Sequence, residues 1–400
     1  MSPEWVMLER SRGSQSVVLS LGECQMRFIV LGGSFGGLIS AYELRKRLPR
    51  PHEVLLISNA RTFVYRPALP FVALGSRDPG AITAQLEPSL EKRGIGFLQA
   101  TVTRIDPSAR RVFTSAGDVD YDYVVVALGA HLEREAVAGL DTYTECVLWL
   151  DDALRVREKL KDFSGGHVAV LEVQETPLRC PAYEIAFGLD AYLRRRGLRE
   201  KTRIHFVTYA ESPFDAGGPK ASKIVAQEFE RRGIDLHTGA AVTRIADGIV
   251  YTRDGEALEA NLILAFPPFR GTDAVLRSKG VGDAKGFIPV HTTMESQRFP
   301  RLFAVGDAVA FPGPKSGRMA EVQAKVAAHN IACQVAARGK YKNYRSHVVC
   351  AMDMGDGKGM FAYRKEAPGQ GPLRFSFAMP GRWPAIAKSA LERYFMTAHF

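Results

Sequence analysis

The stretch that decides the fold is RFIVLGGSFGGL, residues 27–38. An apolar run of strand length meets a cluster of glycines, and a helix-like segment follows through Ala41–Arg45. This order of strand, tight turn and helix is the context that a dinucleotide-binding turn requires. Such a turn points backbone N–H groups and the positive end of the helix dipole at a pyrophosphate. We therefore expect a dinucleotide site at this turn.

The glycine pattern departs from the usual one at two places. Gly32 and Gly37 hold the first and third positions of G-x-G-x-x-G, but Ser34 holds the second, where a Cβ atom crowds the approach of a phosphate. The next expected strand, Glu53–Ser58, is followed by Asn59 and not by the acid that holds a ribose. The candidate cofactor contacts here are Gly32, Gly33, Ser34, Phe35, Gly36, Gly37 and Asn59.

Bulk properties narrow the class of protein. The 400 residues are 46% hydrophobic, enough for a large core and two or three domains, and the net charge is +10. That charge favours an anionic membrane surface or anionic substrates, whereas no nucleic-acid-binding signature and no zinc spacing occurs. No apolar run reaches the roughly 18 residues of a membrane span. Residues 1–25 contain no convincing signal peptide, so we interpret them as a disordered extension or a misplaced start and expect a cytoplasmic protein.

The chain repeats itself once. LEKRGI at residues 90–95 recurs as FERRGI at 229–234, and Val102–Ile105 recurs identically as Val242–Ile245. The first strand of the second copy is then expected at His167–Leu171. The second copy continues with EVQETP at 172–177, which has two carboxylates and no glycine. We expect this second nucleotide site to be lost, which argues against a nicotinamide cofactor.

Two later motifs identify the dinucleotide. LFAVGDA at 302–308 resembles the second flavin motif of the glutathione-reductase-like superfamily, in which the Asp, here Asp307, binds the ribitol. YVVVALG at 123–129 matches the middle motif of the same superfamily. The resemblance implies FAD and an α/β fold with two Rossmann-like domains of glutathione-reductase type. The candidate cofactor contacts from these segments are Gly129, Gly306 and Asp307, and Val102 of the first VTRI segment is a further candidate.

The cysteines are the candidate electron donors to a flavin without a nicotinamide site. Pro181 suits the first position of a helix, so Cys180 is expected to cap that helix, with the helix dipole and Arg179 lowering its pKa. Cys350 follows the apolar pair Val348-Val349. Both cysteines can equally be inert buried thiols. Cys333 lies in a helix-like segment and is interpreted as packing.

From about Met26 onward the chain resembles the sulfide:quinone oxidoreductases, relatives of flavocytochrome c sulfide dehydrogenase and type II NADH dehydrogenase. The segments that carry the resemblance are YRPALP (65–70, with Arg66), GAHL (129–132), PAYE (181–184), GFIP (286–289), PKSG (314–317, with Lys315) and VVC (348–350). In that family two cysteines take up sulfide sulfur and pass electrons to FAD, and a quinone accepts them. The resemblance assigns these roles to Cys180 and Cys350, and it places Cys146 near or bonded to the flavin. One departure is that Cys180 adjoins Pro181 directly, where the family commonly has intervening residues.

The C-terminal residues 383–400 carry an apolar stripe at helical spacing. The stripe consists of Ile386, Ala390, Leu391, Tyr394, Phe395 and Ala398, and the charged Lys388, Glu392 and Arg393 lie off it. Such a helix can lie in a bilayer interface and admit a membrane quinone, or it can pack on the protein's own core. Lys315, just before an expected helix, is a candidate to stabilise charge on the reduced flavin.

These observations define an expected organisation. We expect FAD-binding segments at 26–135 and 271–335, a second Rossmann-like domain at 136–270, and a quinone and membrane region at 336–400. The expected protein is a peripheral enzyme on the cytoplasmic side of a membrane, with sulfide and quinone as partners and homo-oligomerisation left open. The alternatives are a cytochrome-linked sulfide dehydrogenase, an NADH:quinone oxidoreductase and a non-enzymatic flavin/thiol redox sensor.

Overall fold

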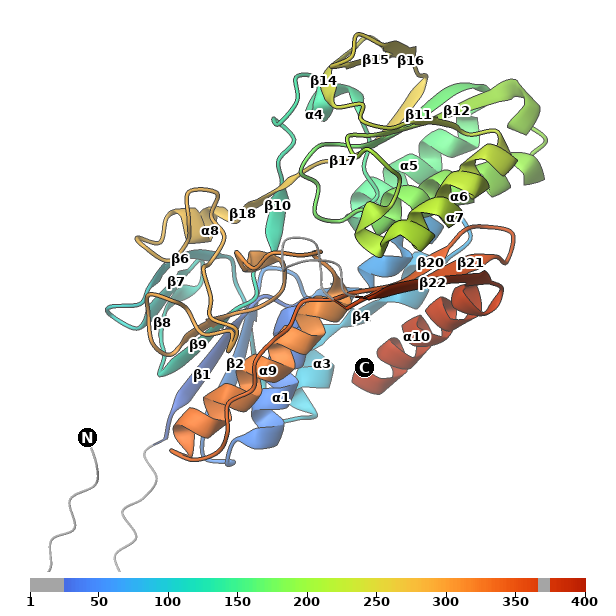
Figure 1. Cartoon of the computed structure of the whole chain (residues 1–400). Helices are drawn as coiled ribbons and strands as arrows, with labels where there is room; N and C mark the ends of the chain where they lie inside the picture. The colour runs from blue at the N-terminus through green and yellow to red at the C-terminus, as the bar shows by residue number, and fades with distance from the viewer. Residues whose placement is uncertain (1–24, 366–374) are drawn as a thin grey trace, which may run out of the picture.

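The computed structural model describes residues 25–365 and 375–400. Apart from Gln25, the expected N-terminal extension lies outside the described residues, as does Cys24. Two α/β units lie one above the other, and a layer made of the C-terminal strands and helix lies beside them (Figure 1).

The first unit is built on a parallel sheet with strand order β19-β9-β1-β2-β5. Apolar residues of β1 are paired on both sides, with Phe28 opposite Val54 of one neighbour and Tyr123 of the other. Helices α1 and α9 pack along each other against this sheet. The elements are β1 (Arg27–Leu31), α1 (Phe35–Arg47), β2 (Glu53–Ser58), β5 (Gly96–Gln99), β9 (Tyr123–Val126), β19 (Leu302–Ala304) and α9 (Gly317–Val335).

Short elements between β2 and β5 close one side of the first unit. They are β3 (Thr62–Val64), η1 (Arg66–Ala68), α2 (Leu69–Ala73), η2 (Pro79–Ile82), β4 (Thr83–Gln85) and α3 (Leu86–Glu91). Strands β3 and β4 pair antiparallel.

The second unit repeats the plan with the parallel strand order β13-β12-β11-β17. Its first strand begins at Gly166, which confirms the position expected from the repeat. The elements are α4 (Leu140–Tyr143), α5 (Leu150–Asp162), β11 (Gly166–Glu172), α6 (Cys180–Arg195), η3 (Arg199–Lys201), β12 (Thr202–Thr208), η4 (Asp215–Gly217), α7 (Pro219–Arg232), β13 (Asp235–His237) and β17 (Leu262–Phe266).

The repeated VTRI segments form matching antiparallel sheets. The pairing register shifts at the same place in both copies, between Val102 and Arg104 and between Val242 and Arg244. A shared irregularity of this kind supports the duplication. The strands are β6 (Val102–Asp106), β7 (Arg111–Thr114), β8 (Gly117–Asp120), β14 (Val242–Ala246), β15 (Ile249–Thr252) and β16 (Ala257–Glu259).

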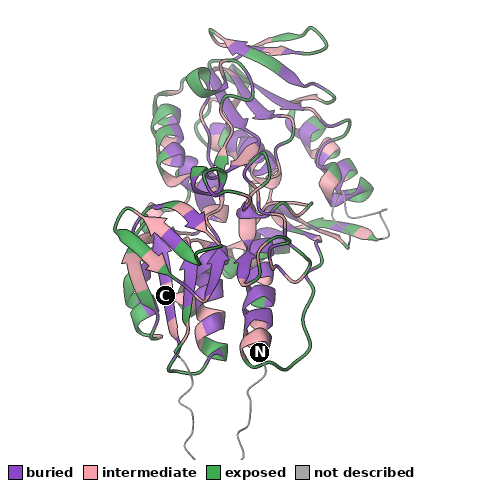
Figure 2. Ribbon diagram, turned by 90° about the vertical axis from the view of Figure 1, so that its left-hand side faces the viewer, coloured by how far each residue is buried: buried purple, intermediate pink, exposed green. Residues whose placement is uncertain are grey.

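Two antiparallel strands link the units, β10 (Ala130–Leu132) and β18 (Phe269–Gly271), and α8 (Asp273–Leu276) and η5 (Gly306–Ala308) follow β18 and β19. The C-terminal layer is an antiparallel sheet covered by α10. Its elements are β20 (Val348–Asp353), β21 (Gly359–Arg364), β22 (Ser376–Gly381) and α10 (Trp383–His399). Figure 2 shows buried strands at the centre of each unit and exposed residues on the outer faces of the helices.

The burial of α10 corrects one expectation. Phe395, expected on the outer stripe, is only 7% exposed and packs against Phe35 and Phe63. Lys388 and Glu392, expected off that stripe, face the protein and form ion pairs there. The other stripe residues, Ile386, Ala390, Leu391, Tyr394 and Ala398, are exposed. Helix α10 therefore buries Lys388 and Glu392 together with Phe395, and it exposes the other five residues of the apolar stripe.

None of the helices within the described ranges is long and apolar enough to cross a bilayer.

A row of histidines crosses the second sheet. His205 lies between His167 and His237, with ring centroids 5.7 and 5.4 Å away, and its Nδ1 is 3.2 Å from Nε2 of His237. Burial lowers the pKa of His205 to about 4, against the opposing effect of Asp235. Within the described residues, no group of three or more His, Cys, Asp or Glu side chains is arranged to hold a metal ion.

This burial predicts an acid-sensitive second unit. His205 stays neutral in the folded state, whereas in the unfolded chain it gains a proton below about pH 6.5, so stability falls as the pH drops from there towards 4. The loss from His205 reaches about 3 kcal/mol by pH 4. We expect the free energy of unfolding in urea to fall less between pH 7 and pH 4.5 for His205→Gln than for the wild type. His291→Gln, at an exposed histidine, should show the same fall as the wild type. An equal acid effect in both variants contradicts this assignment.

Candidate active site

A cavity of about 1830 Å³ lies where the two units and the C-terminal layer meet. Its volume exceeds the about 300–1,000 Å³ of common ligand pockets, so it has room for a large cofactor and a second molecule. Of the cofactor residues expected from the sequence, the following line it: Gly32, Gly33, Ser34, Phe35, Gly36, Asn59, Arg66, Val102, Gly129, Gly306, Asp307 and Lys315.

The turn after β1 is formed by close backbone contacts. Gly32 has φ +109°, and a Cβ atom there would lie 2.3 Å from the carbonyl oxygen of Ala127. A Cβ on Gly37 would lie 1.8 Å from the carbonyl oxygen of Gly32. Gly37 does not line the cavity; it lets α1 start directly against the turn.

Ser34, the departure from the glycine pattern, is compatible with this turn. It is the N-cap of α1 in an extended conformation, φ −91° and ψ −166°, which any L-residue adopts. Its side chain makes no capping hydrogen bond, so the first amides of α1 face the cavity without a side-chain cap. The turn can therefore receive an anionic group in spite of the serine.

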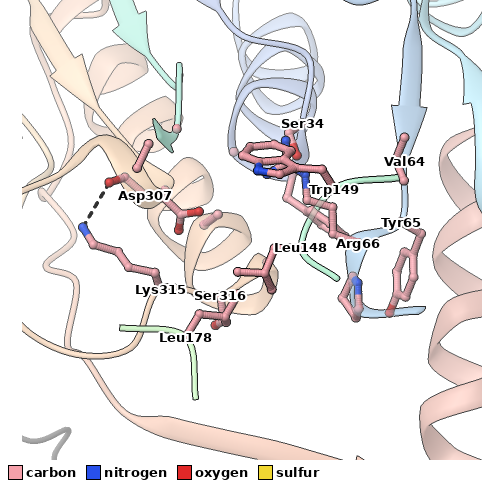
Figure 3. A pocket seen from close by; sticks show the side chains of 18 of the residues that line it. Ser34, Val64, Tyr65, Arg66, Leu148, Trp149, Leu178, Asp307, Lys315 and Ser316 are labelled. Carbon is pink, nitrogen blue, oxygen red and sulfur yellow. Dashed lines mark hydrogen bonds between the residues drawn. The ribbon is translucent and has the colours of Figure 1, made fainter. Parts of the chain in front are cut away.

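Asp307 and Lys315 lie on the opposite wall (Figure 3). Burial raises the pKa of the Asp307 carboxyl, against the effect of Lys315 and Arg66. The Lys315 ammonium donates to the carbonyl oxygens of Asp307, at 3.1 Å, and Val309, and burial lowers its pKa to about 8. Lys315 precedes the N-cap of α9, Ser316, so the positive end of that helix points to the same wall.

Trp149 is a wall residue that the sequence analysis did not single out. The guanidinium of Arg66 lies 3.8 Å from the centroid of the Trp149 ring, and both line the cavity in Figure 3. Burial lowers the pKa of Arg66 to about 10, and Asp307 partly offsets this effect. No motif marks Trp149, because it lies in the turn before α5 and reaches Arg66 only through the fold.

The structure brings Cys180 and Cys350 together, although 169 residues lie between them in the printed sequence. Cys180 is the first residue of α6, and Cys350 lies in the middle of β20. Their thiols are neighbours, and both cysteines line the cavity. Contact with Cys350, followed by burial, raises the pKa of Cys180.

That raised pKa corrects the expected activation of Cys180. The N-cap of α6 is Arg179, one residue earlier than expected. The Arg179 guanidinium points away from the thiol and binds Glu172 and Asp215, so its charge does not favour the thiolate. Because it lies beside a second thiol and is partly buried, Cys180 is protonated when the pair is reduced.

Cys146 does not join this pair. It is 1% exposed, burial raises its pKa to about 12, and it is absent from the cavity wall formed by the described residues. Its neighbours Val147, Leu148 and Trp149 form that wall instead. Its position near or bonded to the flavin stays a prediction.

A buried ion pair lies next to the two thiols and was missed by sequence reasoning. Lys388 of α10 donates to Glu184 of α6, and both side chains line the cavity. Glu184 also accepts a hydrogen bond of 2.9 Å from the backbone N–H of Asp353 in β20. The pair thus connects the helix of Cys180, the strand of Cys350 and α10.

Known proteins resemble this chain over most of its length. The family model described as pyridine nucleotide-disulphide oxidoreductase matches residues 26–332. Sulfide-quinone reductase of Aquifex aeolicus is 30% identical over 92% of this chain and 90% of its own length. The chain belongs to the sulfide:quinone oxidoreductases within that family.

Solved structures support the same family assignment. The sulfide:quinone oxidoreductase from Aquifex aeolicus superposes with a TM-score of 0.88 at 28% identity, covering 94% of this chain and 91% of the other. The type II NADH:quinone oxidoreductase of Staphylococcus saprophyticus is a more distant relative, 21% identical over 88% of this chain and 93% of its own length. These matches confirm the predicted fold class, and they confirm FAD as the cofactor of this oxidoreductase.

The cavity of this family member fits FAD. The hydroxyls of Thr176 and Thr272 are buried at its wall without a hydrogen-bond partner among the described residues. A buried hydroxyl without a partner is costly, and a polar cofactor in the cavity supplies one. The close-packed glycines of the turn and the uncapped amides of α1 provide the matching site for a pyrophosphate.

The ion pair predicts opposite effects on the thiol pair of this oxidoreductase. Glu184 raises the pKa of Cys180 and Lys388 lowers it. Glu184→Gln should therefore shift the alkylation of Cys180 by iodoacetamide to lower pH, and Lys388→Met should shift it to higher pH. Peptide mass spectrometry of alkylated holoenzyme measures both, and FAD content shows that the variants are folded. Shifts in the same direction in the two variants contradict the assignment.

Proposed function

We propose that this protein oxidises sulfide at Cys180 and Cys350 and passes the electrons through FAD to a membrane quinone. The observation that carries the proposal is the contact between these two thiols inside the FAD cavity. The relatives named sulfide-quinone reductase and sulfide:quinone oxidoreductase support the choice of donor and acceptor.

The cofactor-binding roles follow from the walls of the cavity. The amides of residues 32–36 receive the pyrophosphate, and Asn59 and Val102 line the part for the adenosine. Asp307 would hold the ribityl chain by accepting hydrogen bonds, and Lys315 with the start of α9 would stabilise negative charge on the reduced cofactor. Arg66, stacked on Trp149, adds a cation to the same wall. FAD, when bound, takes two electrons from the cysteine pair and gives them to the acceptor.

The thiol chemistry needs both cysteines. Hydrosulfide forms a bond to one sulfur of a Cys180–Cys350 disulfide, the S–S bond breaks, and the other cysteine leaves as a thiolate. That thiolate then bonds to the new persulfide sulfur, with release of one proton and two electrons, which gives a trisulfide. The added sulfur later leaves as polysulfide when another hydrosulfide attacks. Lys388 lies beside the pair to stabilise the transient thiolate.

A nicotinamide donor has no site in the second unit. Where a dinucleotide would approach the end of β11, the Glu172 carboxylate accepts from Tyr183 at 2.9 Å, from Thr208 at 2.6 Å and from Arg179. This hydrogen-bonded group lies at the ends of β11 and β12, where such ligands bind in α/β sheets, and it puts a carboxylate where a pyrophosphate would lie. The relatives named as NADH dehydrogenases therefore support a fold shared with this chain, but not NADH as its electron donor.

The exposed apolar surface of the C-terminal layer supports a route for quinone. The exposed apolar residues there are Val349, Phe375, Phe377, Met379, Trp383, Ile386, Leu391 and Tyr394. Val349, Leu391 and Tyr394 also line the cavity, so this surface continues into its mouth. A helix with an apolar outer face and no membrane span suits binding in the interface of a bilayer. We place the protein there, as a peripheral enzyme on the cytoplasmic side.

Sulfide should bleach the flavin of the holoenzyme under anaerobic conditions, and NADH should not. Cys180→Ser and Cys350→Ser should keep FAD and slow sulfide bleaching by at least about 100-fold, because either change removes the disulfide. Cys333→Ser is the matched control, since that buried cysteine does not line the cavity. Stopped-flow absorbance measures all four proteins. Rapid bleaching by micromolar NADH would overturn the choice of donor.

The outer face of α10 should control access for a long-tailed quinone. Ile386→Glu with Ala390→Glu, two exposed positions that do not line the cavity, should reduce binding to vesicles and slow reoxidation by a long-tailed quinone about tenfold or more, while a short, water-soluble quinone reacts as before. Tyr341→Glu, at an exposed tyrosine outside α10, is the control. Deleting residues 383–400 is a poorer test, because it also removes Phe395 from the cavity wall. Equal slowing with both quinones would assign α10 a structural role only.

A further inference from the structure

The ion pairs of Arg179 connect the start of α6, which carries Cys180, to β11 and to η4. Its guanidinium donates to both oxygens of Glu172, at 3.1 Å for the Nη2–Oε2 contact, and to Asp215. The Glu172 side chain is fully buried and that of Arg179 is 12% exposed. Arg179 directly precedes Cys180, so the position of its side chain fixes the start of α6.

Glu172 is itself held from several sides. Its Oε2 accepts hydrogen bonds from Tyr183 and Thr208, and the Tyr183 hydroxyl accepts from the backbone N–H of Phe214 at 2.8 Å. A buried carboxylate that accepts this many hydrogen bonds is held in a fixed position. The anchor of Arg179 is therefore rigid, and it belongs to the second parallel sheet.

Asp215 belongs to a different contact surface. It begins η4, which packs against all three strands of the C-terminal sheet. The Arg364 side chain of β21 donates to the Asp215 carbonyl oxygen at 3.5 Å, and a Cβ on Gly218 would lie 2.4 Å from Ser376 of β22. Through Asp215, Arg179 thus reaches the sheet in which Cys350 pairs with Ala362 of β21.

We propose that Arg179 is a positioning residue, which links Glu172 to Asp215 and so holds Cys180 against Cys350 for disulfide formation. The inference rests on the proposed function, in which the pair cycles through a disulfide. Because α6 packs on β20 and both cysteines line the same cavity, their effective concentration is high and the disulfide is favoured. When the link to η4 is broken, α6 and β20 move more freely relative to each other. The effective concentration of the thiols then falls, and the equilibrium shifts from the disulfide towards the dithiol.

The test is the equilibrium of the pair with a dithiol buffer. Holoenzyme is equilibrated anaerobically with mixtures of reduced and oxidised dithiothreitol, quenched with acid, alkylated and analysed for the Cys180–Cys350 disulfide by mass spectrometry. In this exchange the two thiols lose two protons and two electrons, and oxidised dithiothreitol takes them up. Asp215→Asn should shift the equilibrium towards the dithiol about tenfold, which is about 30 mV for a two-electron couple.

The control is Asp235→Asn, which breaks another Arg–Asp pair of the second unit, that with Arg203 at 2.5 Å, away from the cavity. It should leave the equilibrium unchanged. Asp215 is half-exposed and its loss keeps the Arg179–Glu172 pair, so the fold is preserved, and FAD content verifies this. Arg179→Lys keeps the positive charge but replaces the planar guanidinium that binds Glu172 and Asp215 at the same time. It should therefore behave like Asp215→Asn.

A second readout separates position from charge. If Arg179 acts by position, the pH midpoint of Cys180 alkylation stays the same in Asp215→Asn. A lower midpoint, caused by the freed guanidinium, together with an unchanged disulfide equilibrium would overturn the proposal. Neither measurement uses sulfide. If sulfide fails to bleach the flavin but Asp215→Asn still shifts the disulfide equilibrium, the proposed function is contradicted. The positioning role of Arg179 is then still supported.

Discussion

The close approach of backbone to backbone at the turn after β1 is the constraint on which the rest of the site depends. A Cβ on Gly37 would lie 1.8 Å from the carbonyl oxygen of Gly32, and one on Gly32 would lie 2.3 Å from that of Ala127. Without these contacts α1 cannot start at the edge of the sheet, and its amides do not reach the cavity. The packing of α1 on α9, and so the placement of Lys315, builds on this turn.

Charge buried between layers completes the site. Glu184, Lys388 and the backbone of Asp353 join α6, α10 and β20 beside the thiols, and Arg179 joins α6 to the sheet below it. Buried ion pairs add little to net stability, but each partner requires the other, because an isolated buried charge is costly. Such pairs suit a site assembled from distant parts of the chain, since they penalise every other arrangement.

The fold was readable from the sequence because its signals are local. Periodic apolar runs, glycines at turn positions and the VTRI repeat each lie within a few residues, so the two parallel sheets and the FAD motifs followed from them. Trp149, Glu184 and the inward-facing Lys388 were missed because their partners lie far away in the chain. Lys388 and Glu392 also contradict amphipathic patterning, which places charges outside. The activation assigned to Cys180 failed for the same reason, as Arg179 binds Glu172 and Asp215 and not the thiol. The domain bounds and the roles of the site residues stay predictions.

The position of α10 in the cavity wall has a consequence for how the protein is made. The glycine turn is among the first described elements to leave the ribosome, but the wall that includes Phe395 and Lys388 is translated after every other element. Until then Phe35 and Phe63 lack the ring that covers them. Translation of α10 therefore completes the described wall of the cavity, and the same step buries Lys388 beside the thiols and adds the exposed apolar residues of this helix. The cavity wall and the apolar surface are in this way formed by the same late element of the described chain.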